Sequence, residues 1–109
     1  MPSRYDKVIV IGDACVDLHI KIDDLINVTK FKEMPYQMCL GGTCGGTSVA
    51  LSKLGVDTAF LGTVGRDYGG KFILQELENY GIDSSMTIVK DDLNTLEVFC
   101  FIDEEGERH

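Results

Sequence analysis

Residues 41–83 read "GGTCGGTSVALSKLGVDTAFLGTVGRDYGGKFILQELENYGID", and this stretch decides the fold class. Its glycine cluster is followed by a short apolar helix over 47–55 and an apolar strand over 56–65. A longer amphipathic helix is expected over 67–81, with Asp67 as its N-cap. Helix, strand and helix in succession are typical of an α/β fold built on a parallel sheet.

The strands outside this stretch are of two kinds. Residues 7–11, "KVIVI", form a continuous apolar run, which predicts a strand in a sheet covered on both faces. The remaining strands have a polar face and do not suit a central sheet. We expect residues 18–22 to pair with 36–40, and 86–90 with 95–102, in a separate small antiparallel sheet.

Size and charge exclude several classes of partner. The chain has 109 residues, the size of one domain. Its formal net charge of -8 repels phosphate backbones, so nucleic acid is not an expected partner. No apolar run approaches the roughly 18 residues that span a bilayer, so no membrane partner is expected. The N-terminus makes a poor signal peptide, and we predict a cytoplasmic protein.

The four cysteines do not form a recognisable metal site. Structural zinc sites need four ligands at characteristic spacings, and no C-x-x-C pair is present. Neither histidine lies near the closest pair, Cys39 and Cys44. We therefore interpret all four as small buried thiols in a reducing cytosol and predict no metal site.

The glycine cluster at 41–48 resembles a phosphate-binding loop with one residue missing. It matches G-x-x-x-x-G-K-[ST], except that Thr47 stands where the lysine belongs. Glycines let backbone N–H groups approach a ligand, and a helix N-terminus attracts electron-rich groups. Three interpretations stay open on this evidence: a phosphate site, a site for other oxygens such as sugar hydroxyls, and close packing of helix on strand. Asp13 and Asp17 follow the first strand and are expected at the same edge of the sheet.

Three stretches in order carry a family resemblance: "VIVIGDACVDLHI", residues 41–83, and "TLEVFCFIDEEGER". A glycine pair, a helix ending in L-G, a strand ending in G-x-V-G-x-D-x-x-G and a helix ending in G-I follow at the expected spacing. The chain resembles the N-terminal part of a ribokinase-like (PfkB family) carbohydrate kinase over essentially all of residues 1–109. The resemblance implies a three-layer α/β/α fold, present here in part, with a small antiparallel β lid.

The resemblance also implies roles for the candidate residues. Gly41 and Gly42 match a glycine pair of the sugar site, and Asp17 matches an acid that holds sugar hydroxyls. Asp13 joins them at the first turn, and Gly46 stands where the family often has an asparagine that touches the sugar. The four polar-faced strands match the lid, which closes over the sugar and often forms a dimer.

Family enzymes transfer the γ-phosphate of ATP, with Mg²⁺, to a hydroxyl of a sugar or nucleoside. Their aspartate base and ATP pocket lie in a second half that these residues do not match. We therefore expect no catalytic residue and no bound cofactor here, and a chain that is inactive by itself. Two alternatives are a non-catalytic sugar-binding module and a degenerate P-loop nucleotide-binding protein.

Overall fold

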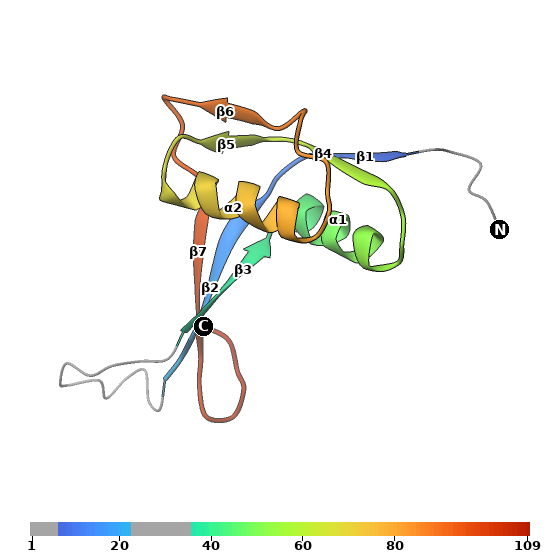
Figure 1. Cartoon of the computed structure of the whole chain (residues 1–109). Coiled ribbons are helices and arrows are strands. Elements are labelled where there is room, and N and C mark those ends of the chain that lie inside the picture. Colours follow the sequence, from blue (N-terminus) through green and yellow to red (C-terminus); the bar gives the residue numbers. More distant parts are fainter. Residues whose placement is uncertain (1–6, 23–35) are drawn as a thin grey trace.

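The computed structural model describes residues 7–22 and 36–109 (Figure 1). In chain order its elements are β1 (Val8–Ile11), β2 (Cys15–Lys21), β3 (Tyr36–Gly41), α1 (Thr43–Lys53), β4 (Thr58–Leu61), β5 (Thr63–Gly65), α2 (Tyr68–Asn79), β6 (Ile88–Lys90) and β7 (Glu97–Ile102). This order confirms the predicted α/β class. Residues 1–6 and 23–35 of the predicted domain lie outside the description.

Two parallel strand pairs form the body of the molecule. β1 pairs with β4, with Val8 beside Thr58, and β5 pairs with β6, with Thr63 beside Ile88. Figure 1 shows both helices on one side of these strands. The described residues therefore supply the strands and one helix layer of the expected α/β/α arrangement. Neither of these helices is long and apolar enough to cross a membrane.

The core forms where β4, β5 and α2 meet. Phe60, Val64, Ile73 and Leu77 are fully buried there. Ile73 and Leu77 occupy one face of α2, as their i, i+4 spacing predicts. The strand expected over 56–65 is instead divided into β4 and β5 at Gly62, where a Cβ would overlap the Phe60 ring. The glycine lets the backbone pass this ring and change its strand partner.

β1 is less covered than its continuous apolar sequence predicted. Ile9 is 48 % exposed and Ile11 is 69 % exposed. Among the described residues β1 has one strand neighbour, β4, so its other edge is open. Ile9 and Ile11 alternate with Val8 and Val10, so they share the face of β1 that points away from the two helices and that the described residues leave uncovered.

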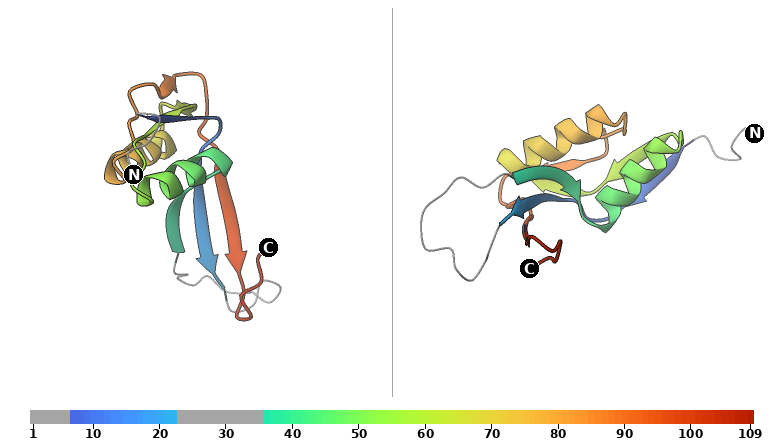
Figure 2. Two further views of the ribbon diagram at one scale, coloured as in Figure 1. Left: turned by 90° about the vertical axis from the view of Figure 1, so that its right-hand side faces the viewer. Right: turned by 90° about the horizontal axis from the view of Figure 1, so that it is seen from below.

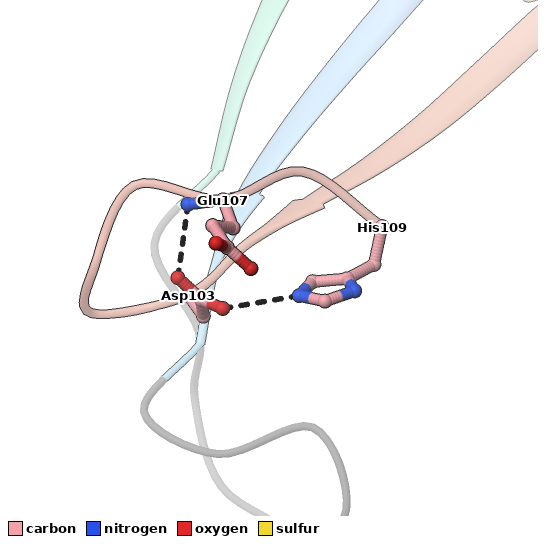
Figure 3. Close-up of side chains that lie close together, drawn as sticks. All are labelled: Asp103, Glu107 and His109. Carbon is pink, nitrogen blue, oxygen red and sulfur yellow. Dashed lines mark hydrogen bonds and ion pairs between the residues drawn. The ribbon is translucent and has the colours of Figure 1, made fainter.

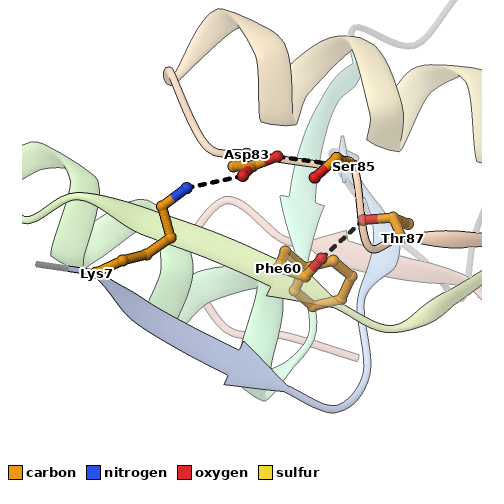
Figure 4. A network of polar contacts seen from close by, with 5 residues as sticks. All are labelled: Lys7, Phe60, Asp83, Ser85 and Thr87. Atoms are coloured by element: carbon orange, nitrogen blue, oxygen red, sulfur yellow. Dashed lines mark hydrogen bonds and ion pairs between the residues drawn. The ribbon is translucent and has the colours of Figure 1, made fainter.

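A polar network attaches the segment after α2 to the edge of β4 (Figure 4). The Asp83 backbone bonds to β4 on both sides, through Thr58 O and Phe60 N. The Asp83 carboxylate lies 2.8 Å from Lys7 Nζ and accepts a hydrogen bond from Ser85 N. The bond to Lys7 holds the pKa of Asp83 well below its usual value and raises the pKa of Lys7.

β2, β3 and β7 form a second sheet, which we call the lid. Its order is β3-β2-β7, and Figure 2 shows the three strands side by side, extending away from the helices. β2 and β3 are antiparallel, as predicted, but β7 is parallel to β2. The predicted pairing of 86–90 with 95–102 was wrong, because β6 pairs with β5 in the body. The lid is thus a mixed sheet of three strands.

The lid has two faces of different chemistry. Leu18 lies beside Met38 and Phe99, and Ile20 beside Tyr36 and Phe101, so these six residues share what we call the apolar lid face. Asp17 lies beside Cys39 and Val98, and His19 beside Gln37 and Cys100, on the opposite, Asp17 lid face. A groove of about 480 Å³ runs along the apolar lid face as far as Tyr68 of α2.

Hydrogen bonds fix the start of β7 to the start of α2. Asp67 is the N-cap of α2, as predicted, and accepts a 2.8 Å hydrogen bond from Gly70 N. The same carboxylate accepts bonds from the Thr95 hydroxyl at 2.6 Å and from Thr95 N at 2.8 Å. Gly65 N in turn donates to the Thr95 hydroxyl. The Thr95 hydroxyl is the main cause of a lowered Asp67 pKa.

Candidate functional site

Asp17 and Gly41 meet at the base of the lid. β2 and β3 are antiparallel, with Cys15 opposite Gly41 and Asp17 opposite Cys39, so Asp17 and Gly41 are diagonal neighbours. A Cβ at Gly41 would overlap the Asp17 carboxylate, so this carboxylate lies directly against the Gly41 backbone. The structure therefore places in contact two residues that the family resemblance assigned to one site.

Gly42 brings Asp13 to the start of α1. Gly42 is the N-cap residue, its φ is 84°, and no side chain caps it. A Cβ at Gly42 would lie 3.2 Å from Asp13 Oδ2 and 3.0 Å from Ala14 Cα. Gly45 N donates a 3.0 Å hydrogen bond to the Asp13 carbonyl oxygen. The turn after β1 is thus fastened to the N-terminus of α1, with the Asp13 carboxylate beside Gly42.

Gly46 lies apart from this group. It belongs to α1 rather than to a loop, and its N–H donates to the Gly42 carbonyl oxygen at 2.9 Å. It is exposed, and a Cβ there would meet no atom within 4 Å. A side chain at this position would have open space, but Gly46 does not contact the carboxylates of Asp13 or Asp17.

The resemblance of 41–48 to a phosphate-binding loop does not extend to its conformation. α1 begins at Thr43, so most of the cluster is helical. The Thr47 hydroxyl donates to the Thr43 carbonyl oxygen at 2.7 Å within the helix. A P-loop needs an extended run of backbone N–H groups around the phosphates. The structure therefore does not favour the degenerate P-loop alternative.

Cys15 is a part of the site that the sequence reasoning did not identify as such. Its Sγ donates a hydrogen bond to Asp17 Oδ1 at 3.1 Å. Burial raises the pKa of the Cys15 thiol to about 12, with further contributions from Asp17 and Asp13. The thiol therefore stays protonated near neutral pH and acts as a donor. The i, i+2 spacing of Cys15 and Asp17 indicates a contact between them only if both residues belong to one strand.

The site is acidic in the part of the chain that the structure describes. Asp13 and Asp17 are its charged groups, and the ion pairs found among residues 7–22 and 36–109 involve other carboxylates. Carboxylates without a cationic partner are good acceptors for hydroxyl groups and poor neighbours for phosphates. The arrangement therefore suits a ligand that presents hydroxyl groups.

A pfkB family carbohydrate kinase domain matches residues 5–109. The chain belongs to the pfkB family of carbohydrate kinases. The family resemblance seen in the sequence is thus confirmed. The relatives found are kinases, and they do not favour a non-catalytic sugar-binding module.

Individual relatives of this pfkB family chain are similar over nearly all of its length. Aminoimidazole riboside kinase of Salmonella typhimurium is 31 % identical over 106 residues, which cover 97 % of this chain and 30 % of that protein. The structure resembles fructokinase from Xylella fastidiosa, with a TM-score of 0.78, 25 % identity and coverage of 96 % of this chain and 32 % of that one.

A third likeness concerns the fold alone. Arabidopsis thaliana ribokinase, in complex with ribose and ATP, aligns with a TM-score of 0.81 and 21 % identity over 95 % of this chain and 34 % of that one. The expected ribokinase-like fold is thereby confirmed, in part of its extent. The chain spans about a third of the length of the relatives that it matches.

A second group of ligand-type side chains follows β7 (Figure 3). Asp103, Glu107 and His109 each place one such atom within 4.8 Å of the others. Asp103 accepts hydrogen bonds from Glu105 N and Glu107 N and lies 3.0 Å from His109 Nε2. The His109 bond is the main cause of a lowered Asp103 pKa. These bonds are those of a turn that is closed by its own side chains and backbone.

Proposed function

We propose that this chain forms the acceptor side of an ATP-dependent sugar or nucleoside kinase. The intact enzyme would transfer the γ-phosphate of ATP, with Mg²⁺, to a hydroxyl group of its substrate. Family membership supports the reaction class, and the relatives named as aminoimidazole riboside kinase and fructokinase indicate the substrate class. The observation that carries the assignment to this site is the Asp17 carboxylate, packed on Gly41 at the base of the lid.

Each residue of the site has a proposed role in this binding. Asp17 accepts hydrogen bonds from substrate hydroxyls, since an ionised carboxylate has acceptor sites on both oxygens. Gly41 and Gly42 let the ligand approach the backbone, and Asp13 supplies a second acceptor at the start of α1. Gly46 leaves open space beside α1, so the residue at this position would determine how large a substituent of the substrate fits there.

The described residues do not fit the nucleotide. No lysine accompanies the glycine cluster, and the helical conformation of α1 removes the cradle that a P-loop needs. We therefore assign ATP and Mg²⁺ to the part of the family kinases that this chain does not match, and we assign no catalytic residue to this chain. The 109-residue chain by itself is expected to transfer no phosphate and to carry no bound nucleotide.

The lid has two proposed roles. Its Asp17 face covers the substrate, and its closure excludes water from the transferred group. Its apolar face is proposed to pair with the lid of a second copy in a homo-oligomer. The four free thiols fit the reducing cytoplasm, where we place the protein.

Titration calorimetry of the 109-residue chain with D-ribose, D-fructose and adenosine tests the proposed site. Loss of a charged hydrogen bond costs about 1.5–3 kcal/mol, so Asp17→Ala should weaken binding at least about tenfold. Asp57→Ala is the matched control, because Asp57 is an exposed carboxylate in the turn before β4. Equal affinities of the Asp17→Ala and Asp57→Ala variants would contradict the assignment. Release of ADP by the chain alone, with ATP and any of these compounds, would contradict its expected inactivity.

A further inference from the structure

Among the described residues, the protein donates a hydrogen bond to one oxygen of the Asp17 carboxylate. Cys15 Sγ donates to Oδ1, and the Gly41 backbone lies against the carboxyl group. Among the described residues Oδ2 has no hydrogen-bond partner. One oxygen is thus occupied by a donor from the same strand, and the other is left for a ligand.

We propose that Cys15 is a positioning residue, whose thiol holds Asp17 in one side-chain rotamer with Oδ2 available to a substrate hydroxyl. This proposal rests on the proposed function in so far as Asp17 binds the substrate. Cys15 and Asp17 lie on the same face of β2, and their residue positions are opposite Gly41 and Cys39 of β3. Cys15 is buried, so its thiol does not occupy surface that a ligand would contact.

The environment of Cys15 suits a hydrogen-bond donor and does not suit a reactive thiol. The residue is 4 % exposed, so oxidants and alkylating reagents have little access to it. Its raised pKa keeps the thiol protonated at neutral pH, and a thiol that is not ionised is a poor nucleophile. A neutral donor also orients the carboxylate without neutralising it, whereas a lysine or arginine would pair with the charge that hydroxyl groups need.

Two substitutions at Cys15 distinguish a positioning role from a packing role, because each role predicts that a different variant resembles the wild type. Cys15→Ser keeps a hydroxyl donor but places a more polar group in a buried position. Cys15→Val removes the donor and keeps an apolar side chain of similar size. If Cys15 only fills space, the valine variant should behave like the wild type and the serine variant should be impaired. If Cys15 positions Asp17, the order is reversed.

The Asp17 rotamer can be measured without any ligand. Three-bond NMR couplings about the Asp17 Cα–Cβ bond should indicate one rotamer in the wild type and in Cys15→Ser. They should indicate averaging over rotamers in Cys15→Val. A single, unchanged rotamer in Cys15→Val would overturn the proposal. Amide spectra and melting temperatures of the same samples verify that each variant is folded.

A second measurement uses the wild-type Cys15 and covers the case in which Cys15→Val fails to fold. The ¹³Cβ shift of Cys15 is followed through its titration in the wild type and in Asp17→Asn. The amide removes the negative charge that stabilises the protonated thiol, so Cys15 should titrate at lower pH in the variant. An identical titration in both proteins would show that the thiol does not interact with the Asp17 charge, and would overturn the proposal.

Binding of D-ribose and D-fructose then distinguishes this proposal from the proposed function. Cys15→Val should weaken whichever sugar binds about tenfold, and Cys15→Ser by less than about threefold. If Asp17→Ala leaves the affinity unchanged, the sugar assignment itself fails. If Asp17→Ala weakens binding while Cys15→Val matches the wild type, the sugar assignment stands and the role of Cys15 is overturned.

Discussion

At the scale of single residues, Gly41 makes room for the carboxylate on which the site depends. Gly41→Ala would place a Cβ on the Asp17 carboxyl group, so it should destabilise the fold and displace Asp17. This destabilisation should largely disappear in an Asp17→Ala background, because the carboxyl group that the new Cβ would overlap is then absent. We expect a coupling of about 0.5–3 kcal/mol in the double-mutant cycle, measured by urea unfolding.

Gly46→Ala is the control for this cycle. It lies in the same helix-forming cluster, but a Cβ there meets open space. Alanine in a helix is about 0.5–1 kcal/mol more favourable than glycine, so this variant should be slightly more stable than the wild type. Additive effects of Gly41→Ala and Asp17→Ala, or equal destabilisation by both glycine substitutions, would contradict the proposed contact.

The family resemblance placed Asp17, Gly41 and Gly42 in one sugar site, but it did not reveal that Cys15 donates a hydrogen bond to Asp17. The sequence analysis began this strand at residue 18, whereas β2 begins at Cys15. Only within a strand do residues two apart share a face, so Cys15 was interpreted as an ordinary buried thiol. Gly46 was assigned to a loop for a related reason. Glycines favour loops locally, but here the packing of Gly45 on Ala14 and Leu40 allows α1 to start early.

At the scale of elements, one carboxylate connects α2 to the lid. Asp67 caps α2 and accepts both hydrogen bonds from Thr95, just before β7. Thr95→Val should lower the melting temperature by several degrees and speed amide exchange at the start of β7. In an Asp67→Ala background the same substitution should have little further effect, because both changes break one network. Full additivity of the two melting shifts would show that the residues act independently.

The same connection explains why the predicted pairing of β6 and β7 was wrong. Neighbouring strands in a chain often pair, and residues 91–96 are short enough for a hairpin loop. They do not form one, because Arg66 N bonds to Lys90 O and Thr95 is held on Asp67. β6 therefore continues the body sheet, and the chain leaves it toward the lid. The sequence pattern indicated strands over 86–90 and 95–102, where β6 and β7 lie, but it carries no information on which partner each strand takes.

The turn after β7 should open at acidic pH. Hydrogen bonds from His109 and from the backbone lower the pKa of Asp103 relative to its ordinary value of 3.8. A carboxyl group whose folded pKa is depressed stabilises the fold above its unfolded pKa, and this contribution is lost as the pH falls through the folded pKa. The bridge between Ile102 and Arg108 should therefore be intact at pH 6 and open progressively below about pH 4.

Amide shifts of Glu105 and Glu107, which donate to Asp103, would follow this opening directly. Asp103→Asn is the matched control, since its side chain has no titrating proton. The turn signals of that variant should be independent of pH in this range. A wild-type turn that stays closed well below pH 3 would show that the carboxylate is not what holds it.

At the scale of the whole molecule, two apolar surfaces stay exposed in the described residues. One is the apolar lid face, where Tyr36 is 64 % and Phe99 is 55 % exposed. The other is β1, where the Ile9 and Ile11 side chains are exposed on one face and the edge opposite β4 is unpaired. Exposed apolar strands attract partners, so both surfaces favour association of the chain in solution. They differ in what they would join: the lid face can pair with an identical face about a two-fold axis, whereas β1 offers an edge for a further strand.

Charge substitutions distinguish these surfaces in sedimentation experiments at micromolar concentration. Replacing both Tyr36 and Phe99 by glutamate puts four charges into a two-fold lid interface, and burial of an unpaired charge is strongly unfavourable. The proposed dimer should therefore dissociate at least about a hundredfold more readily than that of the wild type, equivalent to roughly 3 kcal/mol. Ile11→Glu, on an equally exposed strand residue, should leave the dimer intact. Dissociation by Ile11→Glu alone would place the association at β1, and a monomeric wild-type chain would contradict the proposed lid interface.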